Sequence, residues 1–239
     1  MGKQARNGQG PPTLRLLPRS RTGEQDLAWR LGERAVALLV HMAFRLRVRG
    51  EGAIPTTGAA IVAANHVSLV DPVAIALVVS KRGRVIRFVT AAEFFDKPFV
   101  GWVLRRYGQI AIRRGAADRR ALARTAEIVR RGNLAGIFPE GRVRGPEEPA
   151  VAPHTGVARI AIAAGVPVLP VGVWGGQVRW PAAGPRLGSP LRPPLAVSVG
   201  APIAPHDSAS GRDAARALTE RIMAGVAAME SMARDMTAR

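Results

Sequence analysis

A histidine, a serine and an aspartate stand close together in Asn65-His66-Val67-Ser68-Leu69-Val70-Asp71-Pro72. Histidine titrates near neutral pH and is the usual general base of enzymes. A neighbouring carboxylate can fix the tautomer of the ring and stabilise the imidazolium that forms when the base takes a proton. On a regular helix, residues five apart diverge by about 140°, so His66 and Asp71 can meet only within a turn. Taken alone, the stretch is more simply explained as a strand-end residue and a helix cap.

The proline after Asp71 makes a turn possible. A residue that precedes proline is biased out of the helical region, and Pro72 suits the first position of a helix. We therefore expect a turn over residues 66–71, with Asp71 as the N-cap of the following helix and as the partner of His66. Ser68 is not expected to act as a nucleophile, because the chain has no Gly-x-Ser-x-Gly motif.

Two further strand ends carry charged residues. Gly108-Gln109-Ile110-Ala111-Ile112-Arg113-Arg114 ends in adjacent arginines, whose forked donors match phosphate oxygens. Phe138-Pro139-Glu140-Gly141-Arg142 combines a carboxylate, an arginine and a glycine that permits close backbone approach. A solvated strand end and a plain turn are the simpler explanations of these two segments. Together with His66 and Asp71, however, they suggest one pocket that holds a phosphorylated substrate beside a general base.

These segments must be positioned by strands that alternate with helices. We predict strands at 59–64, 85–91, 109–113, 134–138, 166–174 and 195–200, separated by helical segments. This order is typical of an α/β fold, and we predict an αβα sandwich around a largely parallel or mixed sheet. Pro167 and Pro170 indicate that the strand at 166–174 lies at a sheet edge or follows a bulged path.

The N-terminal region differs from the rest of the chain. Residues 1–25 are predicted to be a disordered basic tail, residues 26–48 an amphipathic helix, and residues 49–239 the catalytic domain. A narrow basic stripe on a broad apolar helix suits the surface of a membrane, although packing against the domain's own core is an equal alternative. The longest apolar stretch here, 35–44, is far shorter than the ~20 residues that a membrane span requires, and no signal peptide is expected.

The net charge of +18 favours polyanionic partners, such as nucleic acid, anionic lipid or phosphorylated substrates. Codon bias towards arginine is a simpler cause. A nucleic-acid-binding protein is a remote alternative, because aromatic residues are only 5% of the chain and no zinc-finger or RNA-recognition signature is present. The absence of cysteine and of a His-Glu-x-x-His motif makes a metal site improbable.

Four ordered segments resemble the blocks of the lysophospholipid/glycerolipid acyltransferase family, of the 1-acylglycerol-3-phosphate acyltransferase type. They are Asn65-His66-x-x-x-x-Asp71, Gly108-x-Ile110-x-x-x-Arg114, Phe138-Pro139-Glu140-Gly141 and Val166-Pro167-Val168-Leu169-Pro170-Val171. The resemblance covers roughly residues 50–205.

The resemblance implies acyl transfer from acyl-CoA or acyl-carrier protein to the hydroxyl of a lysophospholipid such as 1-acylglycerol-3-phosphate, giving phosphatidate. His66 would be the base and Asp71 would orient it. Arg114, Glu140, Gly141 and Arg142 would bind the acceptor, and the supporting residues would be Asn65, Ser68, Gly108, Phe138 and Pro139. No bound cofactor or metal is implied. The expected location is peripheral, at an anionic membrane surface on the cytoplasmic face, with no nucleic-acid partner.

The third block departs from the family. It usually continues with Thr-Arg, whereas Arg142-Val143 follow here, so that Arg142 or Arg144 would have to supply the missing arginine. A different acceptor, such as a glycolipid or an ornithine-type lipid, is therefore an alternative.

Overall fold

The computed structural model describes residues 27–113, 118–145, 147–149, 152–186, 188, 190–205 and 211–238, of which 27–30 by their backbone alone. The predicted tail at 1–25 and the candidate Arg114 lie outside these residues. Within them, no helix is long and apolar enough to cross a bilayer.

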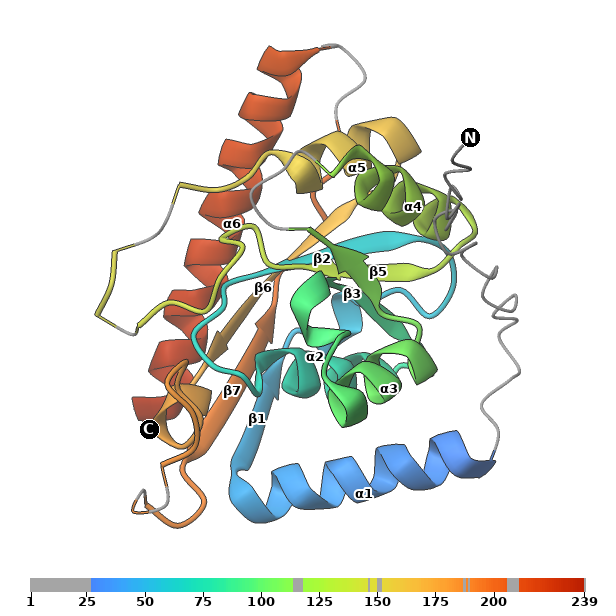
Figure 1. Cartoon of the computed structure of the whole chain (residues 1–239). Helices are drawn as coiled ribbons and strands as arrows, with labels where there is room; N and C mark the ends of the chain where they lie inside the picture. Colours follow the sequence, from blue (N-terminus) through green and yellow to red (C-terminus); the bar gives the residue numbers. More distant parts are fainter. Residues whose placement is uncertain are drawn as a thin grey trace, which may run out of the picture.

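A seven-stranded sheet forms the centre of the molecule, with the strand order β1-β7-β6-β2-β5-β3-β4 (Figure 1). Neighbouring strands are parallel except for β6 and β7, which are antiparallel. The prediction of a largely parallel or mixed sheet is confirmed. The strands are β1 Arg45–Arg49, β2 Ala60–Ala64, β3 Ile86–Ala91, β4 Ile110–Ile112, β5 Leu134–Ile137, β6 Val168–Trp174 and β7 Pro194–Val199.

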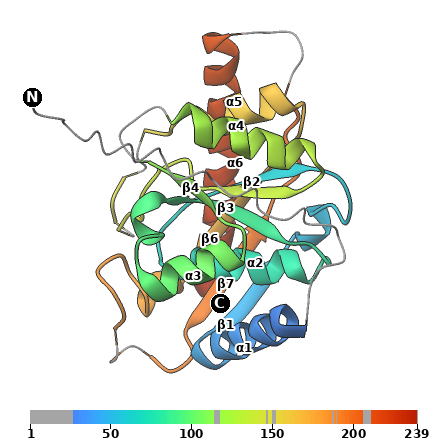
Figure 2. The same cartoon turned by 45° about the vertical axis from the view of Figure 1, so that its right-hand side comes forward.

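Helices cover both faces of this sheet, as Figures 1 and 2 show. Because side chains alternate along β2, Val62 packs in one core cluster with α1 and α2, while Ile61 packs in the other with α4, α5 and α6. The fold is therefore the predicted αβα sandwich. The helices are α1 Leu27–Ala43, α2 Asp71–Ser80, α3 Pro98–Arg106, α4 Arg119–Arg130, α5 Gly156–Ala164 and α6 Arg212–Ala238.

The N-terminal helix is shorter than predicted. It ends at Ala43, and Arg45–Arg49 form strand β1, which pairs with β7. The predicted helix at 26–48 was wrong over its last residues because the segment Arg-Leu-Arg-Val-Arg alternates with the period of a strand. Phe44, which is fully buried, separates the two elements.

Strand β6 lies inside the sheet, between β2 and β7, so the first of the two alternatives drawn from its prolines, a place at the sheet edge, was wrong. Pro170 is tolerated there because the antiparallel pairing with β7 begins only at Val171. At Pro170 itself the contact uses the carbonyl, which accepts a hydrogen bond from the Gly200 N–H at 2.9 Å. A proline's missing donor carries little cost where only its acceptor is used.

Candidate active site

His66 and Asp71 meet at the carboxyl end of β2. The His66 Nδ1 lies 3.0 Å from the Asp71 Oδ2, in the turn that joins β2 to α2. The same oxygen accepts the backbone N–H groups of Val67 and Ser68, each at 2.8 Å. An oxygen that faces three donors acts as an acceptor, so the ring proton sits on Nδ1. Among the described residues nothing hydrogen-bonds to Nε2, which is therefore open to a substrate.

Asp71 does not cap α2, contrary to the prediction from Pro72. Val70 occupies the N-cap position and Asp71 is the first residue of the helix. The carboxylate is fully buried and turns back towards residues 66–68 instead of towards the helix N–H groups. Its Oδ1 has no partner among the described residues.

Two residues beside the pair have structural roles. Ser68 Oγ donates to the Trp180 carbonyl at 2.6 Å and accepts the Val70 N–H at 3.2 Å, so its hydroxyl is fully used. The Asn65 amide forms two hydrogen bonds with the backbone of Val173, accepting at 2.7 Å and donating at 2.9 Å. It thereby fixes the end of β2 against β6.

The segment after β5 holds the backbone of His66 from both sides. The Glu140 Oε1 accepts the His66 N–H at 3.4 Å, and the Arg144 N–H donates to the His66 carbonyl at 2.8 Å. The Phe138 ring stacks on the imidazole with centroids 4.0 Å apart. Gly141 adopts a left-handed conformation, φ 69°, which turns this segment back towards the histidine.

Glu140 and Arg144 form a buried ion pair that extends to the C-terminal helix. Arg144 Nε lies 2.9 Å from Glu140 Oε2, and its Nη2 lies 2.5 Å from Glu230 Oε2 of α6. Burial raises the pKa of Glu140, and the attraction of Arg144 only partly opposes this. Both side chains are therefore engaged within the protein, which leaves Arg142 as the more accessible arginine of the third block. Arg142 pairs with the exposed Glu148 at 2.6 Å.

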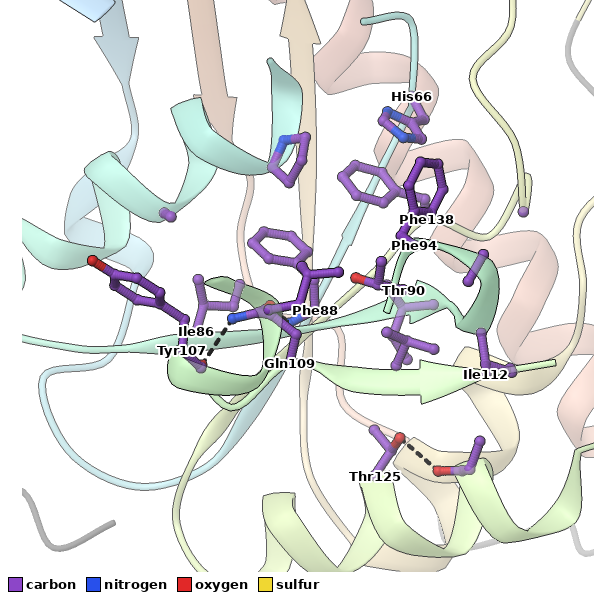
Figure 3. A pocket seen from close by; sticks show the side chains of 18 of the residues that line it. His66, Ile86, Phe88, Thr90, Phe94, Tyr107, Gln109, Ile112, Thr125 and Phe138 are labelled. Carbon is purple, nitrogen blue, oxygen red and sulfur yellow. Dashed lines mark hydrogen bonds between the residues drawn. The ribbon is translucent and has the colours of Figure 1, made fainter. Parts of the chain in front are cut away.

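A cavity of about 1280 Å³ opens beside His66 and runs along the edge of the sheet (Figure 3). Two polar residues of its wall are hydrogen-bonded within the protein: Gln109 bonds the backbone of Phe88 and Tyr107, and Thr125 bonds the Ala121 carbonyl. Most of the other residues of that wall are apolar. The space is therefore suited to an apolar group. Apolar residues of its wall include Val73, Ala76, Ile86, Phe88, Val89, Val103, Leu122, Ile137 and Ile160.

Basic side chains line another part of the same cavity. Arg113, Arg142 and His154 come from three segments, and Arg159 from the exposed side of α5. Sequence reasoning did not name Arg159 or His154 as site residues: His154 lies in the loop before α5, and nothing in the pattern of α5 marks the face that carries Arg159 as one that lines a cavity. Among the described residues no cluster of potential ligands could hold a metal ion.

The remaining predicted residues shape the backbone around the cavity. Gly108, at φ 65°, lies in the turn before β4, where a Cβ would come within 3.1 Å of the Arg87 guanidinium. The Pro139 carbonyl accepts the His154 N–H at 3.0 Å. The structure thus brings the first and third blocks together around one cavity, while the end of the second block, Arg114, lies outside the described residues.

Comparison with known proteins gives a consistent result. The chain is 34% identical over 138 residues to the lyso-ornithine lipid O-acyltransferase of Pseudomonas aeruginosa. That alignment covers 57% of this chain and 50% of the relative, so the matched part spans only half of the relative's length. The crystal structure of the 1-acyl-sn-glycerophosphate acyltransferase of Thermotoga maritima superposes with a TM-score of 0.63 at 25% identity, covering 84% of this chain and 79% of that one.

The family model described as acyltransferase matches residues 45–174, which include the His66–Asp71 pair, Glu140 and the whole of β6. This match spans more than half of the 239 residues. The chain therefore belongs to the acyltransferase family.

Proposed function

We propose that this protein transfers a fatty acyl group from acyl-CoA or acyl-carrier protein to the hydroxyl of a lysolipid, such as 1-acylglycerol-3-phosphate. The observation that carries the proposal is the 3.0 Å contact between His66 Nδ1 and Asp71 Oδ2 at an apolar cavity. It leaves Nε2 as the one ring nitrogen able to take a proton from an acceptor hydroxyl.

The reaction needs no covalent enzyme intermediate. The acceptor hydroxyl gives its proton to His66 Nε2 as its oxygen attacks the thioester carbonyl. When the tetrahedral intermediate collapses, the carbon–sulfur bond breaks and the departing thiolate takes the proton from His66 Nε2. The histidine is then neutral again. Asp71 keeps Nδ1 protonated and stabilises the transient imidazolium. Phe138 and the two backbone hydrogen bonds to His66 limit the movement of the ring between these steps.

The cavity beside the base would hold an acyl chain. Gln109 and Thr125 of its apolar wall are already hydrogen-bonded within the protein, so that a hydrocarbon packed against them leaves their polar atoms paired. The basic lining provided by Arg113, Arg142 and Arg159 would face an anionic group of the acceptor or the donor.

An ornithine-type lysolipid is the second candidate acceptor. The curated relative carries that activity in its name, and here Arg142 is already paired with Glu148. A partly neutralised arginine would bind a phosphate more weakly, so that a zwitterionic head group would be favoured over a phosphate head group. Direct comparison of the two acceptors decides between them.

The test is acylation of a panel of lysophosphatidate, lyso-ornithine lipid and other lysolipids by the wild type and by His66→Ala and Asp71→Asn variants. We expect one acceptor class to be turned over by the wild type, with losses of several orders of magnitude on His66→Ala. Equal turnover by wild type and His66→Ala, or no turnover of any hydroxylated lysolipid with either donor, would refute the proposal.

A membrane surface is the proposed place of the reaction. Helix α1 packs on the domain through Val40, while Leu31, Leu38, Leu39 and Met42 are each more than half exposed. An apolar helix face that the domain does not cover is suited to the interface of a bilayer. In this proposal one face of α1 packs on the domain and the opposite face lies in the membrane interface.

A further inference from the structure

Helix α3 exposes two large aromatic side chains. Phe99 is 75% exposed and Trp102 is 59% exposed, and their rings stack with centroids 6.3 Å apart. Of the nine residues of α3, only Gly101 is buried. A patch of this kind on a soluble surface marks a site of interaction.

The exposure follows from how α3 is seated. A Cβ at Gly101 would lie 2.1 Å from the Phe95 carbonyl oxygen, so the helix approaches the preceding segment through its glycine. This contact fixes Gly101 on the inner side of α3 and keeps Phe99 and Trp102 away from the core. The aromatic pair is therefore held outward by the backbone.

The same surface borders the cavity. Four exposed apolar side chains also line it: Leu69 before α2, Val36 of α1, and Val100 and Trp102 of α3. The side chain of Tyr107, just after α3, reaches α1, since a Cβ at Gly32 of α1 would lie 2.7 Å from the Tyr107 hydroxyl. Figure 2 shows α3 and α1 as separate helices beside α2. The cavity thus has an apolar rim shared by α1 and α3.

Positive charge gathers at the last turn of α3, after the aromatic pair, while the exposed Asp96 and Lys97 before the helix balance each other. Lys97 precedes α3 and lies over the Phe94 ring at 5.0 Å, and Arg105 and Arg106 form the last turn. All three are exposed, and α3 contains no acidic residue. Aromatic rings bordered by lysine and arginine are typical of segments that lie at the head-group level of an anionic bilayer.

We infer that α3 is a second membrane-binding element, which places Phe99 and Trp102 in the interface of an anionic lipid bilayer beside α1. A protein partner on this rim would close the cavity, whereas a bilayer would open it to lipid chains. The inference rests on the proposed function only for the lipid nature of the substrates. Vesicle binding requires no acyl transfer, so failure of one is distinguishable from failure of the other.

The test is co-sedimentation of the full chain with vesicles of phosphatidylcholine and phosphatidylglycerol, 7:3, and of phosphatidylcholine alone. We expect Phe99→Ala/Trp102→Ala to lower the partition constant at least about tenfold, since two large apolar groups leave the interface. The matched control is Trp180→Ala/Leu191→Ala, which removes two exposed apolar side chains that do not line the cavity. It should bind as the wild type does.

A second measurement follows Trp102 directly. Bromine-labelled lipids quench tryptophans that reach the bilayer, and Trp102→Phe should remove more of this quenching than Trp180→Phe. Thermal unfolding of each variant checks that the fold is intact, and we expect a Tm close to that of the wild type. Unchanged binding of the α3 double variant, an equal loss in the control, equal quenching in both phenylalanine variants, or no preference for anionic vesicles would overturn the inference.

Discussion

Removal of Glu230 tests whether helix α6 supports His66, the proposed general base. Glu230 lies outside the stretch matched by the family, yet its carboxylate pairs with the buried Arg144 at 2.5 Å. Arg144 in turn pairs with Glu140, and both residues hold the backbone of His66. Glu230→Ala should therefore weaken the fold and also loosen the base.

The size of the effect follows from the pairing. Removing one partner of a buried ion pair costs about 3–5 kcal/mol when the other charge is left alone. Here Glu140 remains beside Arg144, so we expect the smaller loss of one charged hydrogen bond, about 2 kcal/mol. For a domain of this size that lowers the Tm by about 4–8 °C. A small displacement of His66 should lower kcat on the order of tenfold, with KM little changed.

The assay combines thermal unfolding with steady-state kinetics well below both Tm values. Glu230→Gln keeps a hydrogen bond to Arg144 and should recover part of the Tm and of kcat. Arg234→Ala is the control for the exposed side of the network: Arg234 is half exposed, lies 3.4 Å from the same carboxylate and stacks on the Trp174 ring at 3.9 Å, a contact worth about 0.5–1 kcal/mol at an exposed site. The part of its cost that comes from the carboxylate is the part to compare with Glu230→Ala. That part should be less than about 1 kcal/mol. A Tm within 1 °C of the wild type would refute the buried pair, and a lowered Tm with wild-type kcat would show that the network does not position His66.

Three further substitutions test the site. Asp71→Asn should lower kcat by about 10²–10⁴-fold with little change in KM, because an amide does not hold the ring in the same tautomer; steady-state kinetics that match the wild type would contradict this. Gly136→Ala would place a Cβ 2.4 Å from the Phe88 ring and push it towards the cavity, so activity should fall more with long than with short acyl donors, measured across a donor series. Glu140→Gln tests linkage: burial raises the pKa of Glu140 above its ordinary 4.5, so this group's contribution to stability is present below pH 4.5 and is lost as pH rises through the folded-state pKa. The free energy of unfolding of the wild type minus that of the variant, from urea denaturation, should therefore fall with rising pH, and a rise would show that Glu140 is not held as described.

Much of the fold could be predicted because its signals are local. The apolar run at β2, the helix-start proline of α3 and the glycine that ends α5 depend only on neighbouring residues, and each element lies where those residues indicate. Strand β1 was missed because its alternation is short and joins a helix directly. The interior place of β6 was missed because a proline's cost depends on which of its backbone groups the neighbouring strands use.

The polar contacts of the site were harder to predict. Glu140 and Arg144 belong to one segment, but Glu230 is 86 residues further along and reaches them only through the packing of α6. Helical periodicity shows which face of α6 is apolar. It does not show that the Glu230 carboxylate on this helix meets Arg144, which follows β5. Ion pairs of this kind depend on the tertiary structure.

Asp71 shows how a correct local argument can assign the wrong partner. A turn does lie between His66 and Asp71, and the predicted contact between their side chains is present. The expected cap is absent because proline removes one N–H from the first turn, which lowers the need for a capping acceptor. The unmet donors are instead the N–H groups of Val67 and Ser68, which the turn points at one carboxylate oxygen. The carboxylate is therefore held by the turn that carries the histidine, so that any movement of this turn carries the His66 ring and the Asp71 carboxylate together.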